Sequence, residues 1–438
     1  MAHIEPFRAF RYDPAEVPLS EVATQPYDKI TPEMQERYYI SNPHNLVRVI
    51  LGKREPNDSS TNNPYTRADT FFRDWRHRGV LCQDREPSIY RYVQRFSAPS
   101  SQRNHRLQFE RQGFVAVGKV EDYASGVVFR HEKTLAKPKA DRLDLLRATR
   151  AHFGQIFMLY SDPAGEIDLS LASNRPPDME MTDEYGVLHQ VWRIPDPGII
   201  TRLREKMRDK KLIIADGHHR YETALTYRNE RRTQAGPTHS AEGADYEFAM
   251  MTFVNMDSPG LLILPTHRVV HSLGNFSAEQ FRDRASKLFS VEEADPGLTA
   301  DRATSILKEA GQTGTAILAV SRDRAFLLSR PRNPEQVFQN LSVRQRALDV
   351  VQLHKGVLEN ALGISEDAIR EQKNITYVRD AAEALTLVRS GSADVAFLMN
   401  PVPIQQMRDI AFAGEVLPQK STDFYPKLLS GLTIYALE

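Results

Sequence analysis

Residues 212–225, LIIADGHHRYETAL, constrain the fold of this chain more than any other stretch. The apolar residues 212–214 predict the end of a buried strand, and Asp216 with Gly217 predicts a sharp turn. A helical pattern follows and is clear from Tyr221 onward. A strand, a glycine turn and a helix N-terminus leave unpaired backbone N–H groups and a positive dipole end at one place. Such a place binds anions, most often phosphate.

The turn also carries polar side chains that are costly to bury unless they are used. Arg220 has the planar fork of donors that clamps phosphate oxygens. We therefore predict that the phosphate site consists of Asp216, Gly217, His218, His219 and Arg220, with the two histidines also acting in catalysis. Asp216 is expected to fix the turn or to bind a metal ion through oxygen. The alternative is an ordinary strand-to-helix turn with solvated histidines.

Length and composition narrow the class of protein. A chain of 438 residues predicts two domains or one elaborated domain. Its 57 basic residues balance 57 acidic ones, which argues against a large nucleic-acid footprint or a polybasic membrane surface. The single cysteine, Cys82, excludes an internal disulfide and fits a reducing cytoplasm. With no apolar signal core at its start and no run of 18 apolar residues, the chain is expected to be a soluble cytoplasmic protein without a membrane partner.

Strand and helix patterns alternate along the chain and predict a mixed α/β (α+β) fold. Strands are expected at residues 21–23, 46–51, 88–96, 114–120, 156–160, 187–194, 248–254, 261–264, 315–320, 325–329, 375–378 and 394–399. Helices are expected from residue 32 and at 66–78, 143–148, 199–206, 277–289, 301–310, 343–362, 380–390 and 402–413.

The pattern changes near residue 273 and suggests two domains. We expect a core at residues 1–272 with an insertion at about 85–190, and an α/β subdomain at 273–438. The tail, residues 415–438, keeps its apolar residues and is therefore expected to dock back at the site. There Lys420, Ser421 and Thr422 offer an ammonium and two hydroxyl groups to a nucleotide.

A rigid corner near the N-terminus carries a carboxylate. Pro26 restricts the backbone that precedes Asp28, and Thr31 caps a helix with Pro32 at its first position. Asp28 therefore lies on a fixed turn where it can serve a reaction. The alternative is an ordinary turn aspartate.

A second polar cluster lies at residues 129–150. His131 and Glu132 precede a predicted helix whose start carries Lys139 and Arg142. Cations are unfavourable at a helix N-terminus, so an anionic partner would explain them. A solvated amphipathic helix with local ion pairs is an equal alternative. His267 and Arg268 follow a predicted strand and either face the site or form a surface pair.

Three of these stretches resemble a known superfamily. The motif ADGHHRYETAL is similar to the phosphate turn of the ParB/sulfiredoxin superfamily, and the free L-serine kinases in it carry a DGHHR turn. The corner Pro26-Tyr27-Asp28 resembles their proline–aromatic–acid corner, whose acidic residue is the base. Residues 375–422 resemble the C-terminal part of those kinases. The resemblance implies a ParB/sulfiredoxin-like core that uses ATP or ADP with Mg²⁺.

Nearly the whole chain also resembles the bacterial and archaeal DUF1015 family, whose function is unassigned. The matching motifs are PFRAFRY, PYDKIT, HEKT, PKADRLDLLRATR, IADGHHRYETAL, LPTHR and LPQKSTDFYPK. Two positions depart from the kinases: Asp28 is shorter than their glutamate, and Asp423 stands where they have a basic residue.

Together these features predict a phosphotransferase that acts on the hydroxyl group of a small, serine-like substrate. Asp28 would accept the hydroxyl proton, and the charges at the turn would stabilise the transferring group. Substrate contacts are expected from His131, Glu132, Lys139, Arg142, His267 and Arg268. A phosphoester hydrolase, such as a phosphoserine phosphatase, and a non-catalytic nucleotide-binding regulator are the alternatives. A zinc site formed by His131, His218 and His219 is weaker, since adjacent histidines seldom reach one metal.

Overall fold

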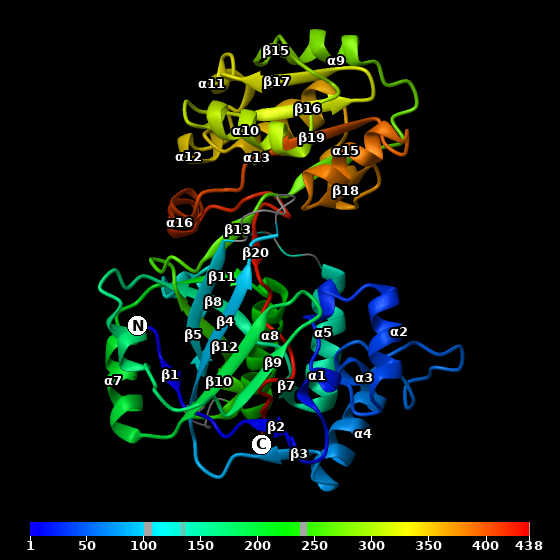
Figure 1. Ribbon diagram of the computed structural model, residues 1–438. Helices are drawn as coiled ribbons and strands as arrows, with labels where there is room; N and C mark the ends of the chain where they lie inside the picture. The colour runs from blue at the N-terminus through cyan, green and yellow to red at the C-terminus, as the bar shows by residue number, and fades with distance from the viewer. Residues whose placement is uncertain (100–106, 133, 135, 237–242, 438) are drawn as a thin grey trace.

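Two α/β halves, each built around its own sheet, make up the chain in a computed structural model (Figure 1). The structure describes residues 1–99, 107–132, 134, 136–236 and 243–437. The first half contains a nine-stranded mixed sheet with the order β6-β11-β8-β12-β5-β4-β10-β9, and β1 pairs with β5. The second contains a six-stranded sheet with the order β15-β17-β16-β19-β14-β18.

The elements of the first half have the following bounds. Its large sheet consists of β1 (Ile4–Glu5), β4 (Ile89–Ser97), β5 (Gln108–Lys119), β6 (Val128–Phe129), β8 (Ile156–Tyr160), β9 (Met179–Thr182), β10 (Leu188–Ile194), β11 (Leu212–Asp216) and β12 (Phe248–Asn255). Its helices are α1 (Leu19–Val22), α2 (Pro32–Ser41), α3 (Val47–Ile50), α4 (Pro64–His77), α5 (Ala136–Thr149), α6 (Glu166–Ser170), α7 (Pro197–Met207) and α8 (His218–Ala235), with short 3₁₀ turns η1 (Tyr27–Lys29), η2 (Tyr123–Ser125) and η3 (Asp245–Glu247).

The second half follows β13 (Leu262–Leu264). Its sheet consists of β14 (His267–Val270), β15 (Ser290–Ala294), β16 (Ile317–Ser321), β17 (Ala325–Ser329), β18 (Ile375–Val378) and β19 (Val395–Met399). Its helices are α9 (Ala278–Ala285), α10 (Ala300–Gly311), α11 (Pro334–Val337), α12 (Val343–Arg346), α13 (Asp349–Gln352), the π-helix η4 (Leu353–Ala361), α14 (Glu366–Arg370), α15 (Ala381–Arg389) and α16 (Ile404–Phe412).

The centre of the large sheet is fully buried. Every residue of β8, IFMLY, and of β12, FAMMTFVN, is buried. Continuous apolar runs of this kind belong to strands that are covered on both faces. Residues 85–190, which we expected to form an insertion, supply β4, β5 and β8 to this sheet, where β8 lies between β11 and β12 and β5 lies between β12 and β4.

Three local predictions were wrong. Residues 46–51 form α3 rather than a strand, because Asn45 Oδ1 accepts from the Val47 N–H at 2.9 Å and starts a helical turn. The apolar side chains of α3 then pack in one cluster with those of α4. Residues 21–23 fall largely in α1. The central helix begins at His218, one turn before the expected start.

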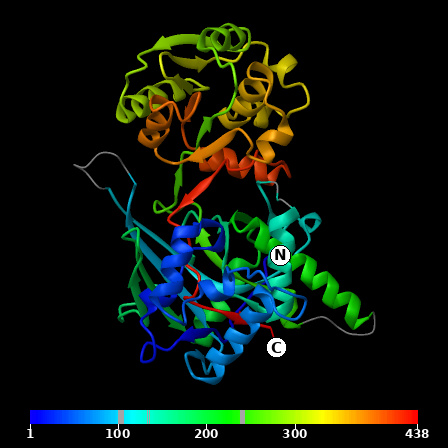
Figure 2. The ribbon, with the colours of Figure 1, turned by 90° about the vertical axis from the view of Figure 1, so that its right-hand side faces the viewer.

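The tail crosses from the second half back into the first, as the red segment shows in two views (Figures 1 and 2). β20 (Asp423–Tyr425) pairs with β13, and β21 (Tyr435–Ala436) pairs with β7 (Ala151–His152). A further small sheet joins β2 (Phe10–Tyr12) to β3 (Leu81–Gln83).

The buried guanidinium of Arg111 holds this tail through hydrogen bonds. Arg111 is 1% exposed, and its Nη1 donates to the Tyr425 carbonyl at 3.2 Å. Its Nη2 donates to the Pro426 carbonyl at 2.5 Å, and its Nε donates to Gln94 Oε1 at 3.0 Å. Backbone carbonyls of the tail therefore satisfy a cation that belongs to the large sheet.

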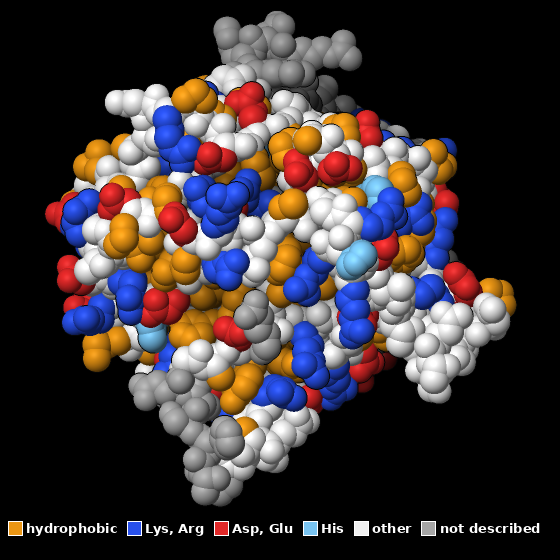
Figure 3. Space-filling view, turned by 90° about the horizontal axis from the view of Figure 1, so that it is seen from below, with side chains coloured by type: hydrophobic (Ala, Val, Ile, Leu, Met, Phe, Trp, Pro, Cys, Tyr) orange, Lys and Arg blue, Asp and Glu red, His pale blue; other side chains and the backbone are white. Residues whose placement is uncertain are grey.

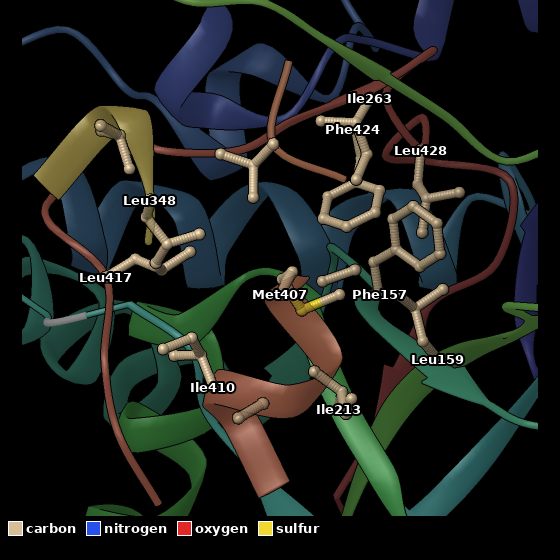
Figure 4. Close-up of a cluster of buried hydrophobic side chains, with 14 of the residues drawn as sticks. Phe157, Leu159, Ile213, Ile263, Leu348, Met407, Ile410, Leu417, Phe424 and Leu428 are labelled. Atoms are coloured by element: carbon tan, nitrogen blue, oxygen red, sulfur yellow. The ribbon is translucent and has the colours of Figure 1, made fainter. Parts of the chain in front are cut away.

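The two halves meet through apolar side chains (Figure 4). Phe157 and Ile213 come from the large sheet, Met407 and Ile410 from α16, and Phe424 from the tail. This packing places α16 and the tail at the end of the sheet where β11 leads into α8. The face seen from below carries basic and acidic side chains interspersed with apolar ones (Figure 3). None of the helices in the described part of the chain is long and apolar enough to span a membrane.

Candidate functional site

A cavity of about 600 Å³ lies between the two halves. Four stretches that are distant in the sequence meet in it: the η1 corner, the turn into α8, the edge strand β18 and residues 419–427. Its lining consists of Tyr27, Asp28, Lys29, Glu132, Pro138, Ala215, Asp216, Gly217, His218, His219, Arg220, Thr266, Gln372, Ile375, Thr376, Tyr377, Val378, Arg379, Gln419, Lys420, Thr422, Asp423 and Lys427.

The turn into α8 has the geometry of an anion site. Gly217 is the N-cap of α8 with φ 90°, and among the described residues no side chain caps the helix. Asp216 Oδ1 accepts from the Gly217 N–H at 2.7 Å, so Asp216 fixes the turn. A Cβ at position 217 would lie 3.0–3.1 Å from the Arg220 guanidinium, so a side chain there would have to displace Arg220 as well as adopt a left-handed φ. The first-turn N–H groups and the positive dipole end therefore face the cavity.

The floor of the cavity is a chain of ion pairs centred on Lys427 and the buried Asp423. Lys427 Nζ lies 2.9 Å from Asp216 Oδ2 and 3.0 Å from Asp423 Oδ1. Arg379 Nη2 also donates to Asp423 Oδ1, at 2.9 Å. Burial would raise the pKa of Asp216, but Lys427 and Arg220 outweigh it and hold that pKa well below its usual range. Burial likewise opposes ionisation of Asp423, yet Lys427 and Lys29 lower its pKa to about 2.

The contacts of Asp216 and His131 leave little room for the metal sites that the sequence suggested. Both oxygens of Asp216 already accept hydrogen bonds, so a cation at Asp216 would compete with Lys427. Within the described ranges, no group of three or more His, Cys, Asp and Glu side chains is placed to hold a metal ion. The zinc alternative loses its basis as well, because both ring nitrogens of His131 are engaged. A magnesium ion carried by nucleotide phosphates would not need such a cluster.

The rim of the cavity carries the N-terminal corner. Asp28 is exposed in η1 and lines the cavity. Burial lowers the pKa of His219, and the Asp28 carboxylate opposes that shift, so the two side chains are electrostatically coupled. Lys29 Nζ lies 3.9 Å from Asp423 Oδ1. Burial and the Lys427 charge lower the pKa of Lys29.

His131 and Glu132 connect the large sheet with the tail. His131 is fully buried; its Nδ1 lies 2.8 Å from the Ile214 carbonyl and its Nε2 lies 2.8 Å from Thr422 Oγ1. Glu132 Oε1 accepts from the Lys420 N–H at 2.5 Å. Burial raises the pKa of Glu132, although the Lys420 N–H and charge oppose this.

Lys139 and Arg142 do not line the cavity. Lys139 Nζ lies 2.9 Å from Glu222 Oε2, and Arg142 donates to the Ile50 carbonyl at 2.7 Å. The Arg142 guanidinium also lies over the Tyr27 ring at 4.1 Å. Glu222, not a bound anion, is therefore the partner that explains a cation at the start of α5.

His267, Arg268 and Ser421 lie behind the lining rather than in it. His267 Nδ1 accepts from the Met399 N–H at 3.2 Å. Arg268 donates to the Lys420 carbonyl at 3.1 Å, and the buried Ser421 donates to the Pro418 carbonyl at 2.5 Å. Arg268 and Ser421 therefore support the loop that carries Lys420, which has φ 58°.

Sequence reasoning missed several lining residues, among them Lys29, Lys427 and Arg379. Lys29 and Lys427 stand inside PYDKIT and LPQKSTDFYPK, so their adjacency to motif residues was an available signal. Gln372, Tyr377 and Arg379 carried no local signal, because only the edge position of β18 brings them to the cavity.

The family model described as "Protein of unknown function (DUF1015)" matches residues 4–351. The chain belongs to the DUF1015 family. No curated protein matches it. The match ends at residue 351. Two of the four stretches that meet in the cavity, β18 and residues 419–427, therefore lie beyond the part that the DUF1015 model covers.

Solved structures resemble this DUF1015 member distantly. A free serine kinase in complex with AMP shares 12% identity over 68% of this chain and 83% of that chain, with a TM-score of 0.36. A conserved hypothetical protein from Pyrococcus furiosus shares 10% identity over 68% and 87%, with a TM-score of 0.34. SbnI with C-terminal truncation from Staphylococcus aureus shares 11% over 72% and 85%, also with a TM-score of 0.34. Likeness at this level carries no argument about function.

Proposed function

We propose that this DUF1015 protein is a nucleotide-dependent phosphotransferase that acts on the hydroxyl group of a small metabolite, serine or a serine-like hydroxy amino acid. The supporting observation is that Asp28, Lys420 and the N-terminus of α8, which no described side chain caps, line one cavity. We further propose that the β11–turn–α8 unit belongs to a ParB/sulfiredoxin-like core.

The anion-binding part of the proposal is the turn into α8. Backbone N–H groups of residues 218–220 and the helix dipole would hold nucleotide phosphate oxygens. Arg220 is the adjacent fixed cation, since its Nη1 also donates to the Gln155 carbonyl. Lys420 would approach from the tail, and a magnesium ion would arrive with the nucleotide phosphates.

The burial of His218 and His219 changes the role that we propose for them. Burial lowers the pKa of His218 and of His219, so both rings are neutral near pH 7. Neutral imidazoles donate hydrogen bonds but do not neutralise charge. His218 Nε2 is buried and has no hydrogen-bond partner among the described residues, so it is available to a ligand. Positive charge at the transferring group would come from Arg220 and Lys29 instead.

In the proposed chemical step, Asp28 is the base. Its carboxylate would accept the proton of the acceptor hydroxyl while that oxygen forms a bond to phosphorus and the nucleotide leaves with the broken P–O bond's electrons. Asp28 lies on the rigid η1 corner at the rim, where a small acceptor can enter.

The decisive experiment mixes the purified protein with Mg²⁺, either ATP or ADP, and a panel of hydroxy amino acids, and then assays for phosphorylated product by mass spectrometry. Phosphorylation of one acceptor supports the proposal. Phosphate release from O-phosphoserine without nucleotide would show a phosphoester hydrolase instead. Thermal stabilisation by nucleotide without turnover on any acceptor would show a nucleotide-binding regulator.

A further inference from the structure

The hydrogen bonds of His131 fix its tautomer. A backbone carbonyl only accepts hydrogen bonds, so the 2.8 Å contact to the Ile214 carbonyl requires the proton on His131 Nδ1. Burial lowers the pKa of His131 to about 4, so the ring is neutral and Nε2 carries no proton. Nε2 is therefore an acceptor at neutral pH.

This tautomer decides which way the Thr422 hydroxyl group points. Thr422 Oγ1 lies 2.8 Å from His131 Nε2, and a hydroxyl group has one proton to donate. Since Nε2 accepts, Thr422 donates its only proton to the imidazole. Thr422 lines the cavity, and its oxygen can then offer only lone pairs to a ligand.

Glu132, like Thr422, offers hydrogen-bond acceptors to the cavity. It follows His131 in the chain, lines the cavity, and uses Oε1 to accept from the Lys420 N–H. An ionised carboxylate has acceptor oxygens and no donor. The pair Glu132 and Thr422, called here the acceptor corner, therefore repels phosphate oxygens and complements a group that carries N–H bonds.

We propose that the acceptor corner binds the ammonium group of the phosphoryl acceptor, and that His131 is the positioning residue that sets its polarity. This inference deepens the proposed function by naming an amino-bearing acceptor. It also reverses the expectation that Thr422 holds a phosphate group, because the Thr422 proton is already committed to His131.

Two ligand groups share this chemistry: the ammonium group of an amino acid and the exocyclic amino group of adenine. The charge of Glu132 selects the ammonium group, since a cation beside a half-buried carboxylate stabilises its ionised form. The two sources differ in a simple way. Replacing adenine by guanine puts a carbonyl at C6 in place of the 6-amino group of adenine, whereas removing the substrate ammonium leaves the nucleotide unchanged.

The test compares matched ligands and matched variants. The ligands are L-serine and 3-hydroxypropionate, which differ by the amino group, each titrated calorimetrically with ATP and then with GTP. The variants are Thr422→Val, which removes the acceptor oxygen, and Thr422→Ser, which restores it. A hydrogen bond to a charged group is worth roughly 1.5–3 kcal/mol, so Thr422→Val should weaken L-serine binding about ten- to a hundredfold and leave 3-hydroxypropionate binding unchanged.

His131→Phe keeps a ring but frees the Thr422 proton. It should shrink the preference for L-serine over 3-hydroxypropionate, whereas a merely structural His131 would lower both affinities together. Circular dichroism and thermal melting show whether this variant folds; if it does not, the Thr422 pair decides the question alone.

The outcomes separate the two proposals. Equal L-serine affinity in Thr422→Val and the parent, or no binding of L-serine at all, overturns the acceptor corner, and phosphorylation of 3-hydroxypropionate would still support the phosphotransferase. A loss of ATP rather than L-serine affinity, absent with GTP, assigns the corner to adenine and also overturns the proposal. Selective loss of L-serine binding in a protein that transfers no phosphate would support the corner and refute the enzyme.

Discussion

Lys427 Nζ contacts Asp216 Oδ2 at 2.9 Å across 211 residues of sequence. The contact joins the turn at the end of β11 to the tail that returns from the second half. Lys427 contacts Asp423 as well, at 3.0 Å, and its side chain is 9% exposed. Burial alone would lower the pKa of Lys427, but the two carboxylates raise it, so this lysine is charged. The turn into α8 and the tail therefore depend on one another electrostatically.

Replacing this lysine should destabilise the whole protein. Lys427→Met removes the cation that Asp216 and the buried Asp423 share, and breaking a buried pair in this way costs up to about 3–5 kcal/mol. Denaturant unfolding measures the loss. Lys287→Met, at an exposed lysine of the second half, is the control and should change stability little. Equal stability of the Lys427 and Lys287 variants would contradict the inferred role.

Acid should weaken the protein through Asp423. The pKa of this carboxyl is about 2 when folded, below the unfolded value of about 3.9. A depressed folded pKa gives stability that is fully present above the unfolded pKa and is lost as pH falls through the folded one. The free energy of unfolding should therefore fall between about pH 4 and pH 2, and the Asp423→Asn variant should show a shallower fall. Denaturant titrations across that range compare the slopes.

Removing the proposed base should separate chemistry from binding. Asp28→Asn keeps the shape of the η1 corner but cannot accept a proton, so kcat should drop about 10²–10⁴-fold. Nucleotide affinity should be preserved, because the turn into α8 is untouched. Glu33→Gln, at an exposed carboxylate of α2 outside the cavity lining, is the control and should turn over normally. If Asp28→Asn lost nucleotide affinity as strongly as it lost kcat, Asp28 would not be the base.

Glycine substitution should distinguish backbone cost from site damage. Gly217 and Gly126 have φ of 90° and 67°, so alanine at either position costs about 1–2 kcal/mol of stability. A Cβ at 217 also displaces the Arg220 guanidinium, whereas none of the described atoms lies within 4 Å of a Cβ at 126. Both variants should melt earlier, but only Gly217→Ala should lose nucleotide affinity. Comparable affinities, measured calorimetrically, would rule out the turn as a phosphate site.

The sequence predicts features that depend on neighbouring residues better than features that depend on tertiary packing. Residues 212–217 predicted the strand and the turn because apolar residues, a carboxylate and a glycine act on their immediate neighbours. Residues 46–51 misled, since an apolar β-branched run is equally compatible with a short helix once Asn45 starts the turn and α4 covers its side chains. Periodicity contains no information on which element will cover a run of this kind.

The same limit applies to the candidate site. Among the expected polar residues, Asp28, Glu132 and Lys420 line the cavity, whereas Lys139 and Arg142 do not. Lys139 looked like a ligand-binding cation because its partner, Glu222, lies 83 residues away. Tertiary pairing, which a local motif does not encode, decides whether a charge is satisfied internally or left to a ligand.

Arg111 makes the two halves inseparable. Its guanidinium lies inside the large sheet, yet two of its acceptors are the carbonyls of Tyr425 and Pro426. A first half expressed alone would retain a buried cation that has lost two of its three acceptors, and the second half alone would lose the sheet that its tail enters. The boundary visible in the ribbon is therefore not a point at which recombination can exchange modules.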